Sequence, residues 1–311
     1  MSSTITFTKL KKVYESNRNV MKFIRENENK NSNSFDAILA SYDLQTGSYI
    51  NNLRKPTFRK VLNNYTQSLA EILNSLHFNS ILEAGVGEGT TLAYLLKKLE
   101  NQRLLYSGFD ISYSRMSYCK RFLHEHSYKQ PILFTGNYLF TPIRDNSIDI
   151  VYTSHSIEPN RGREKEIILQ LYKVARKYLI LLEPSNELGN DETKKHIEEH
   201  KYCLNLAKHS KELGLNIIEH RLFEYSSNPK NQTALIVIEK KPKRDVEKAP
   251  DNVLACPQCK GDLTFHLDNY FCTNCCLIYP VINSIPCLLP ENGIRASKFL
   301  EKKLARKHYS N

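Results

Sequence analysis

The stretch Ile81-Leu82-Glu83-Ala84-Gly85-Val86-Gly87-Glu88-Gly89-Thr90-Thr91 sets three glycines at alternate positions after an apolar run, and an amphipathic helix is expected to follow. Glycine has no Cβ, so its backbone can lie close to a ligand, and the free N–H groups at a helix start favour a hydrogen-bond acceptor. The spacing G-x-G-x-G, with Glu83 two residues before the first glycine, departs from the G-x-G-x-x-G dinucleotide fingerprint. It predicts a cofactor-binding turn of a different kind.

The apolar runs around this turn predict an α/β fold. Short runs at 80–84, 105–109, 131–134, 149–153 and 177–183 alternate with helical stretches, which is the βαβ pattern of a parallel sheet covered on both faces. Two further β-rich runs, at 216–223 and 233–238, flank a turn-forming segment and predict a closing hairpin. Ligands of such sheets bind beyond the carboxyl ends of the strands.

Several segments in order resemble class I S-adenosylmethionine (SAM)-dependent methyltransferases. The glycine turn resembles their motif I, (D/E)-x-G-x-G-x-G, and Asp110 stands where the family holds the ribose hydroxyls. The segment from Phe134 to Asn137 resembles the part of the family in which the residue after a glycine meets the adenine amino group. Asn137 replaces the usual Asp, and its amide oxygen can still accept that hydrogen bond.

The resemblance implies a Rossmann-like, seven-stranded sheet whose last strand is antiparallel, and it implies SAM as cofactor. It also implies a set of cofactor-binding residues: Glu83, Gly85, Gly87, Gly89, Asp110, Ile111, Asn137, Tyr138 and Ser154. His155 follows the fourth strand, beside the expected methyl group, and is the candidate general base, with Glu158 as a second candidate. A histidine held there for structural reasons is the alternative.

A cysteine-rich segment near the C-terminus predicts a metal site. Cys256-Pro257-Gln258-Cys259 and Cys272-Thr273-Asn274-Cys275 are two C-x2-C knuckles, and each can direct two thiolates at one zinc ion. The predicted ligands are Cys256, Cys259, Cys272 and Cys275, with the adjacent Cys276 left out. The text from Cys256 to Pro290 resembles the tRNA methyltransferase 112-like family of small zinc-ribbon proteins, which are partners of methyltransferases acting on tRNA, rRNA and release factors.

These observations divide the chain into five parts. We expect a helical N-terminal cap at 1–78, a SAM-dependent methyltransferase domain at 79–239, a charged linker at 240–252, a β-rich zinc-binding domain at 253–293 and a basic tail at 294–311. Within the cap, residues 41–49 are a candidate lid over the cofactor, with a cap that makes no direct contact as the alternative.

The predicted activity is transfer of a methyl group to an O or N atom of a small molecule or glycan precursor. One alternative is an RNA or protein methyltransferase that uses its fused zinc module, and a remote one is a non-catalytic SAM-binding adaptor. The net charge of +11 admits a nucleic-acid partner, although no basic-aromatic recognition motif accompanies it. The sequence predicts no membrane span and no signal peptide, and therefore a cytoplasmic protein. It leaves the acceptor and the oligomeric state open.

One competing motif points to different chemistry. His196-Ile197-Glu198-Glu199-His200 matches H-x-x-E-H, in which two imidazoles on one helical face bind zinc beside a glutamate base. The surrounding helix is strongly polar and no third ligand pattern follows. A solvated helix between the fifth and sixth strands is the alternative.

Overall fold

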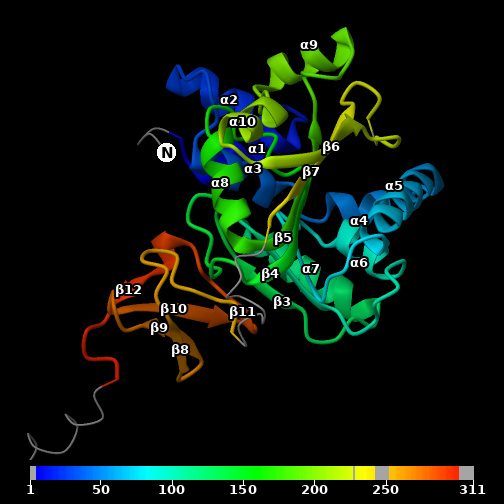
Figure 1. Ribbon diagram of the computed structural model, residues 1–311. Helices are drawn as coiled ribbons and strands as arrows, with labels where there is room; N and C mark the ends of the chain where they lie inside the picture. The colour runs from blue at the N-terminus through cyan, green and yellow to red at the C-terminus, as the bar shows by residue number, and fades with distance from the viewer. Residues whose placement is uncertain (1–4, 227, 242–251, 301–311) are drawn as a thin grey trace, which may run out of the picture.

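The computed structural model describes residues 5–226, 228–241 and 252–300 (Figure 1). The predicted linker at 240–252 therefore lies outside the described residues except at its ends, and so does the predicted tail beyond residue 300. No helix among the described residues combines the length and the apolar character that crossing a membrane requires.

A seven-stranded sheet forms the centre of the molecule, in the order β3-β2-β1-β4-β5-β7-β6. The first five strands are parallel to one another, and β7 is antiparallel to both β5 and β6. The strands span Ser80–Ala84 (β1), Leu105–Asp110 (β2), Ile132–Thr135 (β3), Ile148–Ser154 (β4), Ala175–Pro184 (β5), Asn216–Leu222 (β6) and Thr233–Glu239 (β7). This confirms the predicted fold class, the Rossmann-like sheet of class I methyltransferases with helices around it and a small antiparallel C-terminal sheet.

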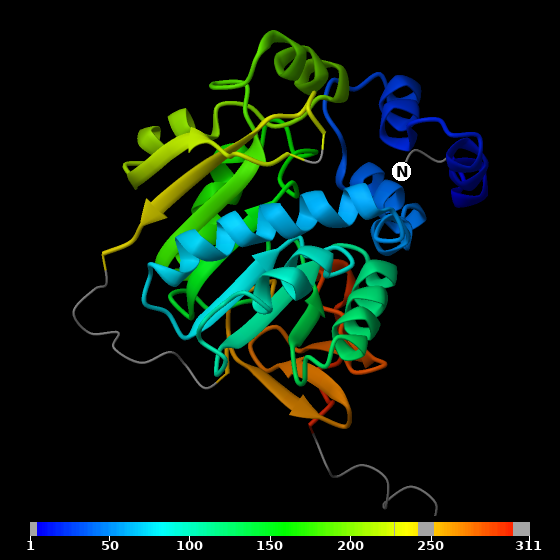
Figure 2. The ribbon, with the colours of Figure 1, turned by 90° about the vertical axis from the view of Figure 1, so that its right-hand side faces the viewer.

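Helices cover both faces of the sheet because alternate strand residues are apolar on each side. Ile81, Ile150 and Tyr152 pack against one helical layer, which is formed by α5 (Pro56–Asn74), α6 (Thr90–Leu96) and α7 (Tyr113–Glu125). Figure 2 shows α5 crossing this face. Leu82 and Val151 face the opposite layer, to which α8 (Glu164–Val174) and α10 (Leu206–Glu212) belong.

Local sequence explains where several helices begin. The Ser112 hydroxyl accepts a hydrogen bond from the Arg115 N–H and caps α7, while Pro56 occupies the first turn of α5, where its missing N–H costs nothing. The N-terminal part consists of α1 (Phe7–Glu15), α2 (Val20–Glu28), α3 (Phe35–Leu44) and the single-turn α4 (Ser48–Asn52). The helix α9 (Asp191–His200) follows β5. In the polar run at 27–34, the first two residues still belong to α2, which ends at Glu28, and the loop follows.

We use the name cysteine module for residues 253–299, which lie beside β3 in Figure 1. Its strands are β8 (Leu263–His266), β9 (Asn269–Cys272), β10 (Leu277–Ile282), β11 (Ile285–Pro286) and β12 (Ile294–Arg295), with a short 3-10 helix at Pro290–Asn292. Four of these strands, in the order β11-β10-β9-β8, form an antiparallel sheet, and β12 pairs with β10.

The cysteine module shares a hydrophobic core with the large sheet. Residues 136–147 connect β3 to β4 without a helix, so this part of the sheet face needs another cover. Leu254, Tyr279 and Leu288 of the module pack in the same buried cluster as Phe109 and Phe134. The module therefore takes the position that a crossover helix would otherwise fill.

Polar contacts fix the module to the β3–β4 connection. The Lys260 ammonium donates to the Thr141 carbonyl oxygen at 2.5 Å and to the Thr141 hydroxyl at 2.7 Å. The Leu288 N–H donates to the Thr135 hydroxyl at 3.0 Å, next to a parallel bridge between Thr135 and Cys287. These contacts attach the module to the edge strand that precedes Asn137.

Candidate functional site

A cavity of about 430 Å³ lies where β1, β2 and β4 end. We call it the glycine-loop cavity, because the loop after β1 forms its floor. Its other walls come from α3, α5 and the segments after β4 and α9. Most of the polar and aromatic side chains around the cavity belong to the following lining residues, given with two glycines and Ile111: Tyr42, Tyr49, Tyr65, Glu83, Gly85, Gly87, Glu88, Asp110, Ile111, Arg115, Asn137, Tyr138, Ser154, His155, Glu158, His196 and Tyr202.

The glycine loop needs residues without side chains for two reasons. Gly85, Gly87 and Gly89 all have positive φ angles, of +76°, +55° and +75°, a conformation that side-chain-bearing residues rarely adopt. A Cβ on Gly85 would also overlap the Tyr138 hydroxyl and the Ser156 side chain. Gly89 is the N-cap of α6 and packs against Cys119, so it shapes the turn without lining the cavity.

Glu83 is a buried acid at the base of the cavity. Its Oε2 accepts a hydrogen bond from the Tyr152 hydroxyl at 2.7 Å. Burial raises the pKa of Glu83 to about 8, although the Tyr152 bond opposes the rise. A cationic ligand in the cavity would stabilise the ionised form of this carboxyl.

Asp110 ends β2 and reaches the glycine loop. Its two carboxylate oxygens accept hydrogen bonds from the N–H groups of Ser112, at 2.9 Å, and Gly87, at 3.1 Å. Burial raises the pKa of Asp110, and the positive charge of Arg115 counteracts part of that rise. Ile111 lies next to it in the cavity wall. A carboxylate in this position can accept hydrogen bonds from ligand hydroxyls.

Three further candidate residues line the cavity at the ends of β3 and β4. The Asn137 amide oxygen accepts the Leu139 N–H at 2.9 Å, which orients the side chain and leaves that oxygen a second lone pair. The Tyr138 hydroxyl donates to the Ala84 carbonyl oxygen at 3.0 Å. The Ser154 hydroxyl lies 2.8 Å from the Tyr65 hydroxyl, which joins β4 to α5.

His155 is bonded at both ring nitrogens. Nδ1 lies 2.7 Å from Glu158 Oε1, and Nε2 lies 2.7 Å from the Thr233 hydroxyl. Burial lowers the pKa of His155, but the hydrogen bond and negative charge of Glu158 outweigh burial, so the pKa is raised. A ring that donates from Nδ1 to Glu158 directs its Nε2 lone pair at Thr233. The Thr233 hydroxyl must turn away before Nε2 can accept a proton from a bound molecule.

Sequence reasoning named residues 41–49 as a candidate lid, and two of its tyrosines line the cavity, but it missed a third tyrosine that closes the cavity from a distant segment. Tyr42 and Tyr49 come from the N-terminal part, and Tyr202 follows α9. Burial and the negative charge of Glu158 raise the pKa of Tyr202. Nothing in the local sequence separates Tyr202 from the chain's other tyrosines. Glu88 and Arg115 had a weak signal, because Glu88 stands between Gly87 and Gly89 and Arg115 follows Ile111 by four residues.

The cavity carries an excess of acidic groups. Glu83, Glu88, Asp110 and Glu158 line it, whereas Arg115 is the one lysine or arginine in the wall among the described residues. A carboxylate-rich wall favours a cationic ligand with hydroxyl groups over an anionic one.

The H-x-x-E-H match forms no three-ligand cluster in the described part of the chain. The His196 and His200 rings lie with their centroids 4.4 Å apart and their planes tilted by 45°, and both lie beside the Tyr202 ring. Burial, together with the neighbouring His196, lowers the pKa of His200. The motif contributes His196 to the cavity wall.

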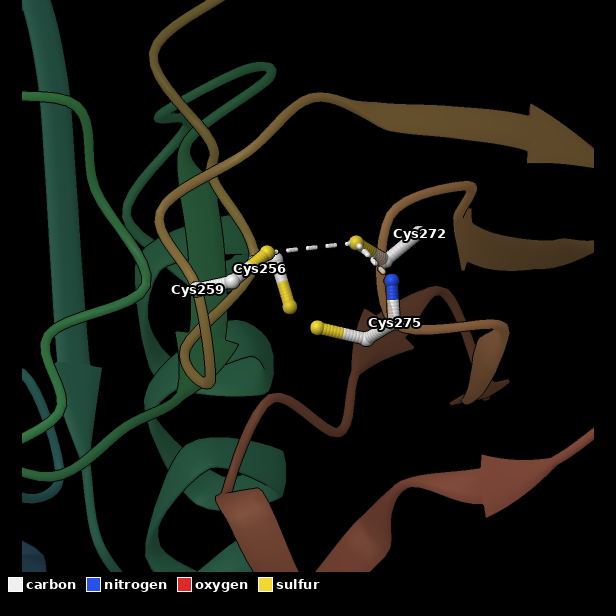
Figure 3. A group of neighbouring side chains, drawn as sticks. All are labelled: Cys256, Cys259, Cys272 and Cys275. Atoms are coloured by element: carbon white, nitrogen blue, oxygen red, sulfur yellow. Dashed lines mark hydrogen bonds between the residues drawn. The ribbon is translucent and has the colours of Figure 1, made fainter.

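The four predicted metal-ligating cysteines converge on one point (Figure 3). The Sγ atoms of Cys256, Cys259, Cys272 and Cys275 all lie within 4.8 Å of one another. Tetrahedral zinc with Zn–S bonds of about 2.3 Å separates its sulfurs by ~3.8 Å, so the four thiols fit such an ion. Cys276 is not part of this group.

Backbone N–H groups support the sulfurs of both knuckles. The Gly261 N–H lies 3.4 Å from Cys259 Sγ, and the Cys275 N–H lies 3.4 Å from Cys272 Sγ. Donors in this position stabilise thiolates, which are the form that binds metal. The arrangement therefore suits a structural metal site with four sulfur ligands.

No protein-family model matches this chain, and no curated protein matches it. Similar solved structures include magnesium protoporphyrin IX methyltransferase from Synechocystis PCC 6803, at 16% identity and a TM-score of 0.47, covering 76% of this chain and 100% of that chain. A SAM-dependent methyltransferase from Aquifex aeolicus has 17% identity and a TM-score of 0.44, covering 62% of this chain and 97% of its own.

Geranyl diphosphate C-methyltransferase from Streptomyces coelicolor A3(2) has 8% identity and a TM-score of 0.45, covering 57% of this chain and 79% of its own. All three are methyltransferases, and the two whose names give an acceptor differ in it, one acting on magnesium protoporphyrin IX and the other on geranyl diphosphate. At such identities the likeness concerns the fold alone. It does not indicate which reaction the residues of the cavity carry out.

Proposed function

We propose that this chain is a SAM-dependent methyltransferase that methylates an O or N atom of a small molecule or glycan precursor. The single observation that carries the proposal is the glycine-loop cavity, in which a side-chain-free turn and Asp110 meet in a wall rich in carboxylates. In this proposal the cofactor contacts Glu83, Gly85, Gly87, Asp110, Ile111, Asn137, Tyr138 and Ser154, while the predicted Gly89 shapes the turn.

The charge of the cavity supports SAM over a dinucleotide. A dinucleotide would bring a pyrophosphate dianion beside Glu83 and Asp110, whereas SAM has a net positive charge, from an ammonium, a sulfonium and one carboxylate. Asp110 can accept hydrogen bonds from ribose hydroxyls, and Asn137 can accept one from an amino group. The residues present therefore fit the cofactor that the sequence implies.

Bound SAM supplies an electrophilic methyl group on a positively charged sulfur. The protein then has to align the acceptor in line with that methyl group and exclude water. Tyr65, Tyr202 and the apolar side chains of α3 and α5 form the walls that can do both.

The acceptor atom must lose a proton when it gains the methyl group. We assign that proton to His155 Nε2, with the Thr233 hydroxyl turning away and Glu158 stabilising the imidazolium. On this assignment His155→Gln lowers kcat by about 100-fold and leaves the affinity for S-adenosylhomocysteine (SAH) unchanged. An unchanged kcat would reduce His155 to a structural residue.

A small acceptor is favoured over a macromolecule by the position of the walls. The N-terminal helices and Tyr202 enclose the acceptor side, while no residue of the cysteine module lines the cavity in the described chain. We further propose that Cys256, Cys259, Cys272 and Cys275 bind a structural Zn²⁺. In this role the ion stabilises the module and does not touch the acceptor.

The test incubates the protein with methyl-labelled SAM and a fractionated cell extract. We expect label in the low-mass fraction. Label in RNA or protein would replace the small acceptor by a macromolecular one, and SAH binding without transfer to any fraction would favour a SAM-binding adaptor. A protein with Asp110→Ala serves as the matched control for label that is not enzymatic.

A further inference from the structure

Glu88 lies between the second and third glycines of the loop, yet its side chain points away from any partner within the loop. Its carboxylate accepts three backbone hydrogen bonds from residues at the start of α4. The N–H groups of Gly47 and Ile50 each lie 2.9 Å from a Glu88 oxygen, and the Tyr49 N–H lies 3.3 Å away. Glu88 itself is only 2% exposed.

A second contact joins the same N-terminal segment to the end of β2. The Ser112 hydroxyl donates to Asp43 Oδ1 at 2.7 Å, while the Ser112 N–H donates to Asp110 Oδ1 at 2.9 Å. Ser112 thus bonds to Asp43 on one side and to the proposed ribose-binding carboxylate on the other. Residues 42–50 are thereby connected to both loops that line the proposed cofactor site.

Arg115 makes a third contact. Its Nε donates to the Tyr42 carbonyl oxygen at 3.0 Å, and its guanidinium lies 4.4 Å from the Tyr42 ring centroid and 5.4 Å from that of Tyr49. The remaining Nη2 is buried and has no hydrogen-bond partner among the described residues. A buried guanidinium N–H without a partner is costly, and a ligand in the adjoining cavity can supply one.

We propose that Glu88 and Arg115 latch the lid predicted at residues 41–49, together with Ile50, to the glycine loop. The inference rests on the proposed function, because the molecule enclosed is SAM. The carboxylate that holds the lid belongs to the same turn that contacts the cofactor, so lid closure and cofactor binding stabilise one another. Glu88 is a positioning residue. When the hydrogen bonds between Glu88 and the lid break, the cofactor can dissociate.

The geometry gives the lid a specific order of events. Tyr42 and Tyr49 line the cavity, and Glu88 bonds to the backbone at the start of α4. While these bonds are closed, the two rings block the exit of the cofactor on this side. Loss of the latch should speed dissociation more than association, because the open state already admits the ligand.

The experiment measures SAH association and dissociation by stopped flow, with hydrogen exchange of residues 42–53 on the full chain. Glu88→Gln retains the side-chain shape but replaces one acceptor oxygen by an N–H donor. We expect SAH dissociation to rise about 10- to 100-fold, association to change less than about threefold, and amide protection in the segment to fall. Glu71→Gln, on the exposed face of α5, is the matched control and should behave as wild type.

Asp43→Ala breaks the connection from the lid side and leaves the glycine loop untouched. It should raise SAH dissociation by about three- to tenfold, and it decides the question if Glu88→Gln does not fold. Dissociation within twofold of wild type in the folded variants would overturn the lid. Absence of SAH binding by wild type is a separate result, because it removes the proposed function before any variant is compared.

Discussion

The cysteine cluster and the glycine-loop cavity are built from chain segments at very different separations. The four thiols come from residues 256–275, and two short knuckles bring them within 4.8 Å of one another. The cavity joins the loop after β1 to the ends of β2 and β4, to the N-terminal helices and to the segment after α9. The first site depends on local turn geometry and on the proposed metal, and the second depends on the packing of the large sheet and the helices around it.

This difference governs how each site should fail. A lost thiolate removes a quarter of the metal's ligands at once, whereas a change in the cavity wall alters one contact among many. The two regions are also coupled, because Leu254 and Leu288 of the cysteine module pack in the same core as Phe109 and Phe134. Loss of the metal should therefore also destabilise the edge of the large sheet at β3.

The largest effect is expected from Cys272→Ser. Structural zinc contributes on the order of 10 kcal/mol to the folding of small domains, so the module should unfold and zinc should fall below one per chain. Hydrogen exchange should rise across the cysteine module and β3 but stay low in β4 and β5. Elemental analysis and exchange mass spectrometry measure both.

Cys276→Ser is the matched control, because Cys276 adjoins the second knuckle without joining the four thiols. It should keep stoichiometric zinc and wild-type exchange. Equal zinc in wild type and Cys272→Ser would contradict the four-cysteine site and, with it, the contrast between the two regions.

An intermediate effect is expected from Gly85→Ala. The added Cβ would overlap Tyr138 and Ser156 at a φ of +76°, so we expect SAH affinity to fall about 10- to 100-fold. Gly214→Ala introduces the same kind of backbone strain, at φ +71°, with no atom within 4 Å of the new Cβ. Calorimetric titration of SAH should show a loss of affinity in Gly85→Ala but not in Gly214→Ala. A similar loss of SAH affinity in both variants would mean that backbone strain alone causes it.

The smallest effect is expected from Glu83→Gln, measured as a pH dependence. Because burial raises the pKa of Glu83 to about 8 from an ordinary value of 4.5, its neutral form stabilises the fold below pH 4.5, and this contribution is lost as the pH rises towards 8. Gln cannot ionise and keeps an acceptor for the Tyr152 hydroxyl.

Thermal unfolding of ligand-free protein at pH 5, 6, 7 and 8 provides the measurement. The Tm of wild type should fall relative to that of Glu83→Gln by about 5 °C across this range. A Tm difference that does not change with pH would show that Glu83 keeps one protonation state throughout.

The parts that the sequence predicted are those in which a local pattern has one structural outcome. The alternating apolar runs define the sheet, and β1 spans Ser80–Ala84 as expected. The C-x2-C spacing likewise brings the four predicted cysteines together. In both cases a pattern among neighbouring residues defines the element, a strand in the first case and a cysteine knuckle in the second.

The remainder depended on contacts between segments far apart in the sequence. Glu88 caps a helix some forty residues earlier in the chain, and the Thr233 hydroxyl bonds to His155 from the seventh strand. The missing helix between β3 and β4 left a face that the cysteine module covers, which no local pattern announces. Predicting such contacts requires knowledge of which elements pack together.

The proposed function requires the glycine-loop cavity to bind SAM, and titration calorimetry with SAH measures binding at this site. Wild type should bind one SAH per chain, and Asp110→Ala should weaken that binding about 10- to 100-fold because the ribose hydroxyls lose a charged acceptor. Asp191→Ala, on the exposed start of α9, should bind as wild type does. Wild-type protein that binds no SAH, or an Asp110→Ala variant with unchanged affinity, would contradict the account.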